Sequence, residues 1–254
     1  MNDDAFFRDL MRWHWPTAGG LLVPVFFPSL SAIVALHTAS STQAALLLPD
    51  RRMSLISVAP GRCLVGVLAV EYRESDLGPY SELAIVVPMA FDAPAGPWVS
   101  MIRDSLARSF SAYVWRMPVS TPLSRDAGVS LAGFPKELAD IRFRQAGGVA
   151  SCELTQDGVP AVSLSCASAA STGRRNLRVR AYTQMQGLSL VSRLHVQETR
   201  FDDRLRPTAA QLELGQGALA DELRALRLSE NPIASHYCAE AKAILFAPRN
   251  AIEG

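Results

Sequence analysis

Lysine is nearly absent from this chain. Only Lys136 and Lys242 are lysines among its 25 basic residues, and the other 23 are arginines. An arginine stays charged, whereas a desolvated lysine can lose its proton and attack a carbonyl carbon as a neutral amine. The scarcity makes each lysine a candidate for a chemical role. A surface lysine after a turn is the simpler alternative.

Net charge and cysteine are also scarce. The formal net charge is +1 and charged residues make up 19% of the chain, so neither a nucleic acid nor an acidic partner is predicted. The four cysteines form no CxxC pair, which argues against a zinc ribbon or a disulfide framework and favours free thiols in the cytoplasm. His236 and Cys238 lie two residues apart, but nothing in the sequence holds them in contact. We expect no metal and no cofactor.

Several common functional motifs are missing. The chain contains no GxSxG nucleophile elbow, no HExxH pair and no Walker loop. The segment from Gly215 to Ala220 mimics a dinucleotide-binding GxGxxA turn, but too few residues follow it to complete a doubly wound sheet. The uncharged segment 19–36 is interrupted by Pro24 and Pro28. It therefore predicts a buried strand that is preceded by an irregular segment, and it does not predict a membrane span.

Hydrophobic periodicity predicts a mainly antiparallel β, α+β fold with a few helices. We expect one domain over residues 1–254, with a helical extension at 1–18. Helices are expected over 5–15, 42–48, 97–108, 121–127 and 217–228. Strands are expected over 62–73, 80–89, 110–119 and 235–246. Five short alternating segments, at 141–145, 150–156, 161–168, 177–184 and 188–197, predict a continuous antiparallel meander with one wet face.

Two short motifs resemble those of the acetoacetate decarboxylase family. Gly133-Phe134-Pro135-Lys136, which follows a short helix and Gly128-Val129-Ser130, is similar to the family's lysine segment. Leu77-Gly78-Pro79-Tyr80-Ser81-Glu82, on a strand that continues to Val87-Pro88, resembles its Tyr-x-Glu strand. The end of the chain, from Leu219 through Ser235-His236 to Leu245, is similar in kind to the family's last helix and strand. The resemblance spans about residue 30 to the end.

The resemblance implies a β-cone or barrel with peripheral helices, an apolar pocket for a small keto substrate, and a homo-oligomer. Its lysine would form a Schiff base with a ketone, which then acts as an electron sink. On this basis Lys136 would be the nucleophile, and Glu82 would orient the substrate or handle protons. The other expected pocket residues are Tyr80, Phe134, Glu137 and His37.

The sequence departs from the family pattern at two places. Decarboxylases of this family carry a second lysine directly after the nucleophile, where this chain has Glu137. An ionised carboxylate that pointed at the amine would favour its charged form. The family's carboxylate-binding arginine belongs near the first strand, but no arginine lies between Arg12 and Arg51. His37 is a partial substitute there, and Arg62, Arg73 and Arg116 are candidates from other segments.

These departures leave three functions open. Decarboxylation of a β-keto acid is the family default. An aldolase, dehydratase or cyclase acting on a larger keto substrate would use the same imine chemistry. A protein that binds an apolar small molecule without catalysis is the third possibility, since both departures affect residues expected at the reacting centre.

Overall fold

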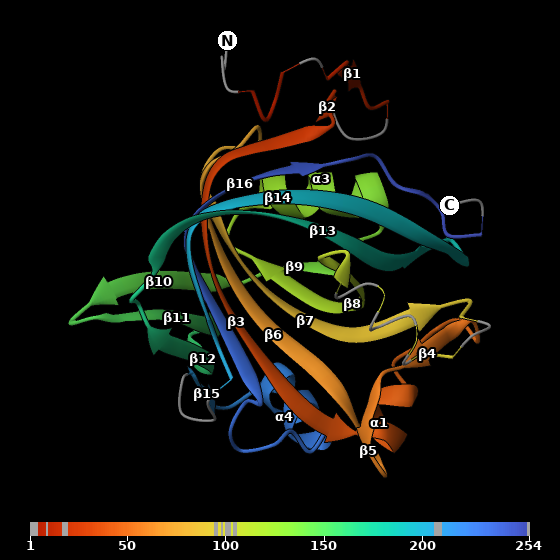
Figure 1. Ribbon diagram of the computed structural model, residues 1–254, viewed down its shortest axis with the longest axis vertical. Coiled ribbons are helices and arrows are strands. Elements are labelled where there is room, and N and C mark those ends of the chain that lie inside the picture. The colour runs from red at the N-terminus through yellow and green to blue at the C-terminus, as the bar shows by residue number, and fades with distance from the viewer. Residues whose placement is uncertain are drawn as a thin grey trace.

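The computed structural model describes residues 5–8, 10–16, 20–93, 96, 97, 99, 103, 106–205 and 210–252. Seventeen strands and three helices have described bounds. The expected mainly antiparallel β fold with a few helices is confirmed (Figure 1). The helices are α1 (Ser41–Ala45), α3 (Pro122–Ala132) and α4 (Ala218–Ala225).

Seven long strands close into a barrel. Their order is β7-β6-β3-β16-β14-β13-β8, and pairing of β8 with β7 closes the ring. All neighbours are antiparallel except β8 and β13. Closure pairs the strand edges with one another and leaves the barrel interior for side chains. The barrel strands are β3 (Val25–Ser40), β6 (Arg62–Glu74), β7 (Tyr80–Phe91), β8 (Ser109–Val119), β13 (Ser171–Met185), β14 (Leu188–Arg204) and β16 (Ala234–Leu245).

Short strands extend the barrel walls. β9 (Lys136–Leu138) runs parallel to the end of β8, where Met117 is in register with Lys136. β4 (Met53–Leu55) pairs with β7, β5 (Ser57–Ala59) with β6, and β17 (Arg249–Asn250) with β14. The sequence pattern did not predict these strands, because segments of two or three residues carry too little periodicity.

A second sheet packs against the outside of the barrel. It has the order β10-β11-β12-β15 and is antiparallel throughout. The expected meander is therefore wrong in one respect: β12 pairs with β15, while β13 and β14 belong to the barrel. Alternation shows which residues share a face of a strand but not which strand lies beside it. The strands are β10 (Asp140–Ala146), β11 (Val149–Gln156), β12 (Val159–Ala167) and β15 (Ala210–Leu214).

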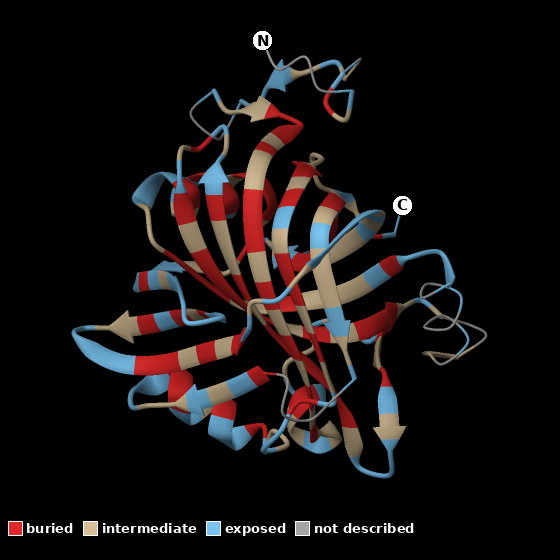
Figure 2. Ribbon diagram, turned by 60° about the vertical axis from the view of Figure 1, so that its left-hand side comes forward, coloured by how far each residue is buried: buried red, intermediate tan, exposed pale blue. Residues whose placement is uncertain are grey.

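The hydrophobic core has two main parts, one on each face of the barrel wall. Many residues of the long barrel strands are buried (Figure 2). The outer part joins the wall to the second sheet and α4, through residues such as Leu83, Leu164 and Leu223. The inner part fills the barrel and includes Tyr72, Tyr80 and, from α3, Leu131. Helix α3 therefore covers the barrel interior, and β7 contributes alternate residues to the two parts.

Two expected helices differ in the structure. The N-terminal helix over 5–15 is wrong in its described part: residues 5–8 form turns, and β1 (Trp13–His14) pairs with β2 (Leu22–Val23). Arg12 donates hydrogen bonds to the carbonyl oxygens of Leu22 and Pro24, so tertiary contacts outweigh helix propensity. The helix over 97–108 lies mostly outside the described residues.

The other expected helices are present with shifted ends. Ser40 caps α1 by accepting a hydrogen bond from the Gln43 amide, as its position before the helix indicates. Helix α3 is longer than the expected 121–127 because it continues through Gly128 to Ala132. The segment 19–36 forms β2 and most of β3. No helix among the described residues is long and apolar enough to span a membrane.

Candidate active site

The end of α3 places Lys136 at the barrel wall. Gly133 ends the helix in the left-handed conformation, with φ of 60°. A Cβ atom at Gly133 would lie 2.8 Å from the carbonyl oxygen of Gln184, so only glycine fits this close approach. The Met117 amide donates to the carbonyl oxygen of Pro135 at 3.1 Å. Backbone contacts on both sides thus hold the GFPK segment against β8 and β13.

Lys136 forms a buried ion pair with Glu82. The distance from Lys136 Nζ to Glu82 Oε2 is 3.0 Å, and the two side chains are only 6% and 8% exposed. Glu82 lies on β7 between Val70 of β6 and Val119 of β8 in register. With so little exposure to water, the two charges stabilise each other directly. The two expected catalytic residues are therefore in contact.

Aromatic rings surround the ion pair. Lys136 Nζ lies 5.3 Å from the ring centroid of Tyr80 and 5.9 Å from that of Phe134. Tyr72 stacks on Tyr80 with centroids 4.5 Å apart, and its hydroxyl donates to Glu82 Oε1 at 3.5 Å. These rings keep the pair away from water, and the faces of the Tyr80 and Phe134 rings attract the ammonium group.

Both tyrosines remain protonated hydrogen-bond donors. Burial raises the pKa of Tyr72 well above its ordinary value, and the negative charge of Glu82 raises it further. Burial raises the pKa of Tyr80 in the same way, with additional contributions from Tyr72 and Glu82. Neither hydroxyl can therefore serve as a base near neutral pH.

Sequence reasoning missed Tyr72 and Gly128. Tyr72 was visible only as one apolar residue in a strand, and its role depends on its register opposite Tyr80. Gly128 faces Lys136 from α3: a Cβ at this position would lie 2.6 Å from Lys136 Cδ and 2.7 Å from Cε. A glycine inside a helix costs about 1 kcal/mol relative to alanine, which was a usable signal of close packing.

Replacing Gly128 by alanine is expected to lower any activity that depends on Lys136 about 10- to 100-fold. The new methyl group must displace the lysine stem and hence Nζ, and a misplacement of about 1 Å can cost 10²-fold in rate. Thermal denaturation is expected to change little, since alanine favours the helix. Val129→Ala, at an exposed position of the same helix, is the matched control. Unchanged activity in Gly128→Ala would contradict the close packing described here.

The other two expected pocket residues lie elsewhere. Glu137 is exposed, because successive side chains of β9 point to opposite sides of the strand. It borders an open groove with Leu138 and Asp140. His37 is fully buried, on the barrel strand β3, and its Nδ1 lies 2.9 Å from the carbonyl oxygen of Ser229. Burial lowers the pKa of His37, which favours the neutral ring.

The position of His37 separates it from the ion pair. Val70, the register partner of Glu82, is opposite Ala32 of β3, and His37 lies five residues beyond Ala32. Five residues of strand span about 16 Å. The strand also alternates, so that Ala32 packs with the inner core whereas His37 shares its face with Ala35 and Ala39 of the outer core. His37 therefore does not replace the carboxylate-binding arginine.

The three arginines considered as replacements are also bound to other groups. Arg116 forms an ion pair with Glu222 of α4, with Nη2 at 2.7 Å from Oε1. Arg62 donates to Thr38 and to the carbonyl oxygen of Arg227. Arg73 donates to the carbonyl oxygens of Leu30 and Ala239. None of these described contacts involves Lys136 or Glu82.

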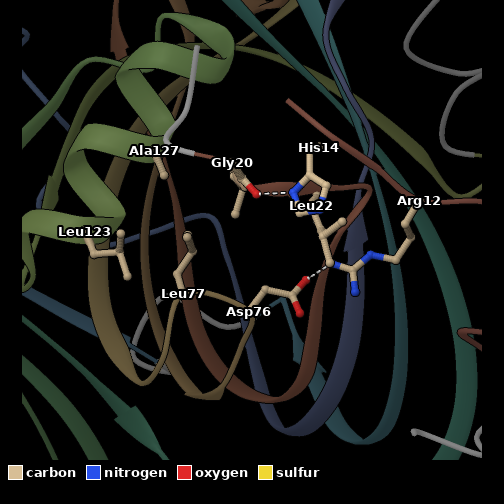
Figure 3. Close-up of a pocket in the computed structure, with 9 residues that line it drawn as sticks. Arg12, His14, Gly20, Leu22, Asp76, Leu77, Leu123 and Ala127 are labelled. Atoms are coloured by element: carbon tan, nitrogen blue, oxygen red, sulfur yellow. Dashed lines mark hydrogen bonds and ion pairs between the residues drawn. The ribbon is translucent and has the colours of Figure 1, made fainter. Parts of the chain in front are cut away.

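A cavity of about 320 Å³ lies beside the helix that covers Lys136 (Figure 3). Its lining does not include Lys136 or Glu82. Leu123 and Ala127 of α3 form one side, and Leu77 and Asp76 form another. Asp76 also forms an ion pair with Arg12. Ala127 and Leu77 belong to the inner core as well, so the cavity borders the residues that enclose the ion pair.

Comparison with known proteins identifies the family. The family model of acetoacetate decarboxylase (ADC) matches residues 15–247. No curated protein matches the chain. Solved structures of three different proteins share the fold of this chain.

The acetoacetate decarboxylase of Legionella pneumophila has a TM-score of 0.64 and 14% identity, covering 90% of this chain and 87% of its own. The enduracididine biosynthesis enzyme MppR, complexed with the condensation product of pyruvate and imidazole 4-carboxaldehyde, has a TM-score of 0.61 and 14% identity, with coverage of 89% and 88%. An acetoacetate decarboxylase-like enzyme from Sphingomonas wittichii RW1 has a TM-score of 0.52 and 12% identity, with coverage of 89% and 92%. The expected acetoacetate decarboxylase-like fold is confirmed, and since the family model matches most of its length, the chain belongs to the acetoacetate decarboxylase family.

Proposed function

We propose that this protein is a lyase that decarboxylates a β-keto acid through a Schiff base on Lys136. The contact that carries the proposal is the buried pair of Lys136 Nζ and Glu82 Oε2, 3.0 Å apart. The Tyr80 and Phe134 rings lie within 6 Å of the Lys136 amine and leave it little exposed to water. A carboxylate at hydrogen-bonding distance gives that amine a partner for proton transfer.

Glu82 would act first as a base. It accepts a proton from the Lys136 ammonium group, which leaves a neutral amine and a neutral carboxylic acid in the apolar interior. The amine attacks the ketone carbon and forms a carbinolamine. Glu82 then returns a proton to the carbinolamine oxygen, which leaves as water and gives the protonated imine.

The imine would then accept the electron pair of the breaking bond. The carboxylate β to the imine leaves as carbon dioxide, and the electrons of the broken carbon-carbon bond form an enamine. A proton from solvent is added to the enamine carbon, and water hydrolyses the resulting imine to release the ketone and Lys136. Tyr72, which donates to Glu82, would hold that carboxylate in one orientation during these transfers.

Borohydride trapping tests this proposal directly. The protein is incubated with acetoacetate or a longer β-keto acid, reduced with sodium borohydride and digested for mass spectrometry. We expect one adduct, on the peptide that contains Lys136, and release of carbon dioxide before reduction. Since Lys242 is the only other lysine, the peptide map distinguishes the two side chains. The absence of a Lys136 adduct across a panel of ketones would refute the Schiff base, and an adduct without carbon dioxide release would refute decarboxylation.

Cytoplasmic location and homo-oligomerisation remain predictions.

A further inference from the structure

A second polar cluster lies on strands β13, β14 and β16, with Glu198 and Cys238 buried and Asp203 exposed. His236 is placed between two carboxylates: its Nε2 is 2.7 Å from Glu198 Oε1, and its Nδ1 is 2.8 Å from Asp203 Oδ1. Arg175 Nη2 lies 2.7 Å from Glu198 Oε2. Cys238 follows His236 by two residues and therefore faces the same side of β16. The side chain of Glu198 is 4% exposed and Cys238 is 1% exposed.

This cluster is separate from the Lys136–Glu82 pair. Cys238 is in register with Ala32 of β3, Ala32 with Val70 of β6, and Val70 with Glu82 of β7. Three strand spacings, about 14 Å along the wall, therefore separate Cys238 from Glu82. Cys238 belongs to the inner core, so both polar groups face the same apolar interior from different walls. The proposed decarboxylation does not use the second group.

We propose that Glu198, His236 and Cys238 form a binding site for a divalent transition metal ion, with zinc as the preferred ion. The carboxylate oxygen, the imidazole nitrogen and the sulfur all lie within 4.8 Å of one another. Zinc bonds of about 2.0–2.3 Å in a tetrahedron place its ligand atoms about 3.3–3.8 Å apart. Closing the site therefore requires side-chain shifts of about 1 Å.

The neighbouring groups orient these ligands as in known metal sites. Asp203 is bound to His236 Nδ1, which leaves Nε2 as the ligand atom, and a carboxylate in this place is the usual partner of a zinc-bound histidine. Arg175 Nε donates to Glu198 Oε2 at 2.8 Å, which leaves Oε1 directed at His236. The guanidinium of Arg175 also lies over the ring of Phe201, 4.1 Å from its centroid. His236 and Glu198 each have a second polar side-chain atom, and in both residues that atom is already hydrogen-bonded to a neighbouring side chain.

The set of donor atoms selects the class of metal. A thiolate and an imidazole favour zinc and related ions over magnesium and calcium, which prefer oxygen ligands. Three protein ligands leave the fourth tetrahedral position to water or to a ligand in the barrel interior. The site thus has the composition of an open zinc site rather than that of a closed structural one.

Metal binding is tested on the full chain after removal of bound metal with a chelator. Cobalt(II) is titrated into the protein, and we expect the near-ultraviolet charge-transfer absorption of a cobalt–thiolate bond, saturating at one cobalt per chain. Zinc should displace cobalt and remove the band. Elemental analysis after dialysis should then give one zinc per chain. Lack of a saturable cobalt–thiolate band in the wild-type protein would overturn the proposal.

Variants assign the site. Cys238→Ser should abolish the charge-transfer band. Asp203→Asn removes the carboxylate that binds His236 Nδ1 and Arg175, and it should weaken zinc binding about 10- to 100-fold. The matched control is Cys166→Ser, since Cys166 is also a buried thiol but lies on β12 of the second sheet. A band that persists in Cys238→Ser or disappears in Cys166→Ser would assign the metal elsewhere. The wild-type cobalt titration tests the proposal without any variant, so the proposal can still be refuted if a variant fails to fold.

Discussion

Replacing Lys136 by arginine should reduce carbon dioxide release from a β-keto acid by roughly 10³-fold or more. Arginine keeps the positive charge next to Glu82, but its guanidinium does not form an imine with a ketone. The same variant should lose the exchange of ketone α-protons for deuterium, which any lysine enamine catalyses. Proton NMR of acetone or pyruvate in heavy water measures this exchange without knowledge of the natural substrate.

Lys242→Arg is the matched control for this prediction. Lys242 lies on β16, in register with Gln197 of β14. Its replacement removes the only other lysine of the chain. We expect its activity and exchange rate to remain within about twofold of wild type, since arginine keeps the charge of this half-buried side chain and β16 carries neither Lys136 nor Glu82. Circular dichroism and thermal denaturation establish that Lys136→Arg is folded. Full activity in a folded Lys136→Arg protein would refute the Schiff-base mechanism.

Glu82→Gln should lower turnover about 10²- to 10³-fold, the range expected when a positioned acid and base is removed. The amide keeps the size of the side chain and can still accept a hydrogen bond from Tyr72, but it cannot take a proton from Lys136. The variant should therefore be slow to form the imine, and borohydride trapping at short incubation times should give less adduct. The loss should appear mainly in kcat, since the shape of the pocket is preserved.

Glu71→Gln separates this chemical effect from a general loss of charge on the barrel wall. Glu71 is the next acidic residue on the neighbouring strand, where it accepts a hydrogen bond from Ser31 and lies 3.8 Å from Arg73. It is in register with Ser81, one residue before Glu82 on β7, so it faces the opposite side of the wall. Turnover of Glu71→Gln near the wild-type value is expected. Equal losses in the two variants would show that Glu82 has no specific role in proton transfer.

The two motifs were readable from the sequence because each is local. GFPK contains its own helix end, since Gly133 adopts the left-handed conformation that stops α3. Tyr80 and Glu82 are two residues apart on a strand, which puts both side chains on one face. Most long strands were also predicted within a few residues of their bounds. The apolar alternation that forms them is a property of each segment alone.

The assignment of Glu137 and His37 to the pocket had no such local support. Adjacency along the chain suggested Glu137, but alternation in β9 turns it away from Lys136. His37 was placed by its position in the corresponding strand, yet it lies on the outer face of the barrel wall. A bulge between Ser29 and Leu30 shifts the register of β3 against β6, and the sequence carries no clear signal for it.

The proposed metal site of Glu198, His236 and Cys238 also could not be predicted from a local motif. The sequence shows His236 and Cys238 two residues apart, without a CxxC or HExxH spacing. The third ligand, Glu198, comes from β14, and its guanidinium partner comes from β13. Pairing of β14 with β16 includes two register shifts near Glu198 and Arg200, which decide that Glu198 reaches His236. No linear motif describes such a group.

The sequence by itself determined most of the long strands, the helix end before Lys136, the chemical type of each candidate residue and the family. The tertiary structure alone decided that Lys136 and Glu82, more than fifty residues apart, share a buried contact, and that Tyr72 and Gly128 enclose it. It also decided that Glu198 lies against His236. The physical reason is that side-chain periodicity is set within one strand, whereas barrel closure, strand order and bulges are set by the packing of all strands together.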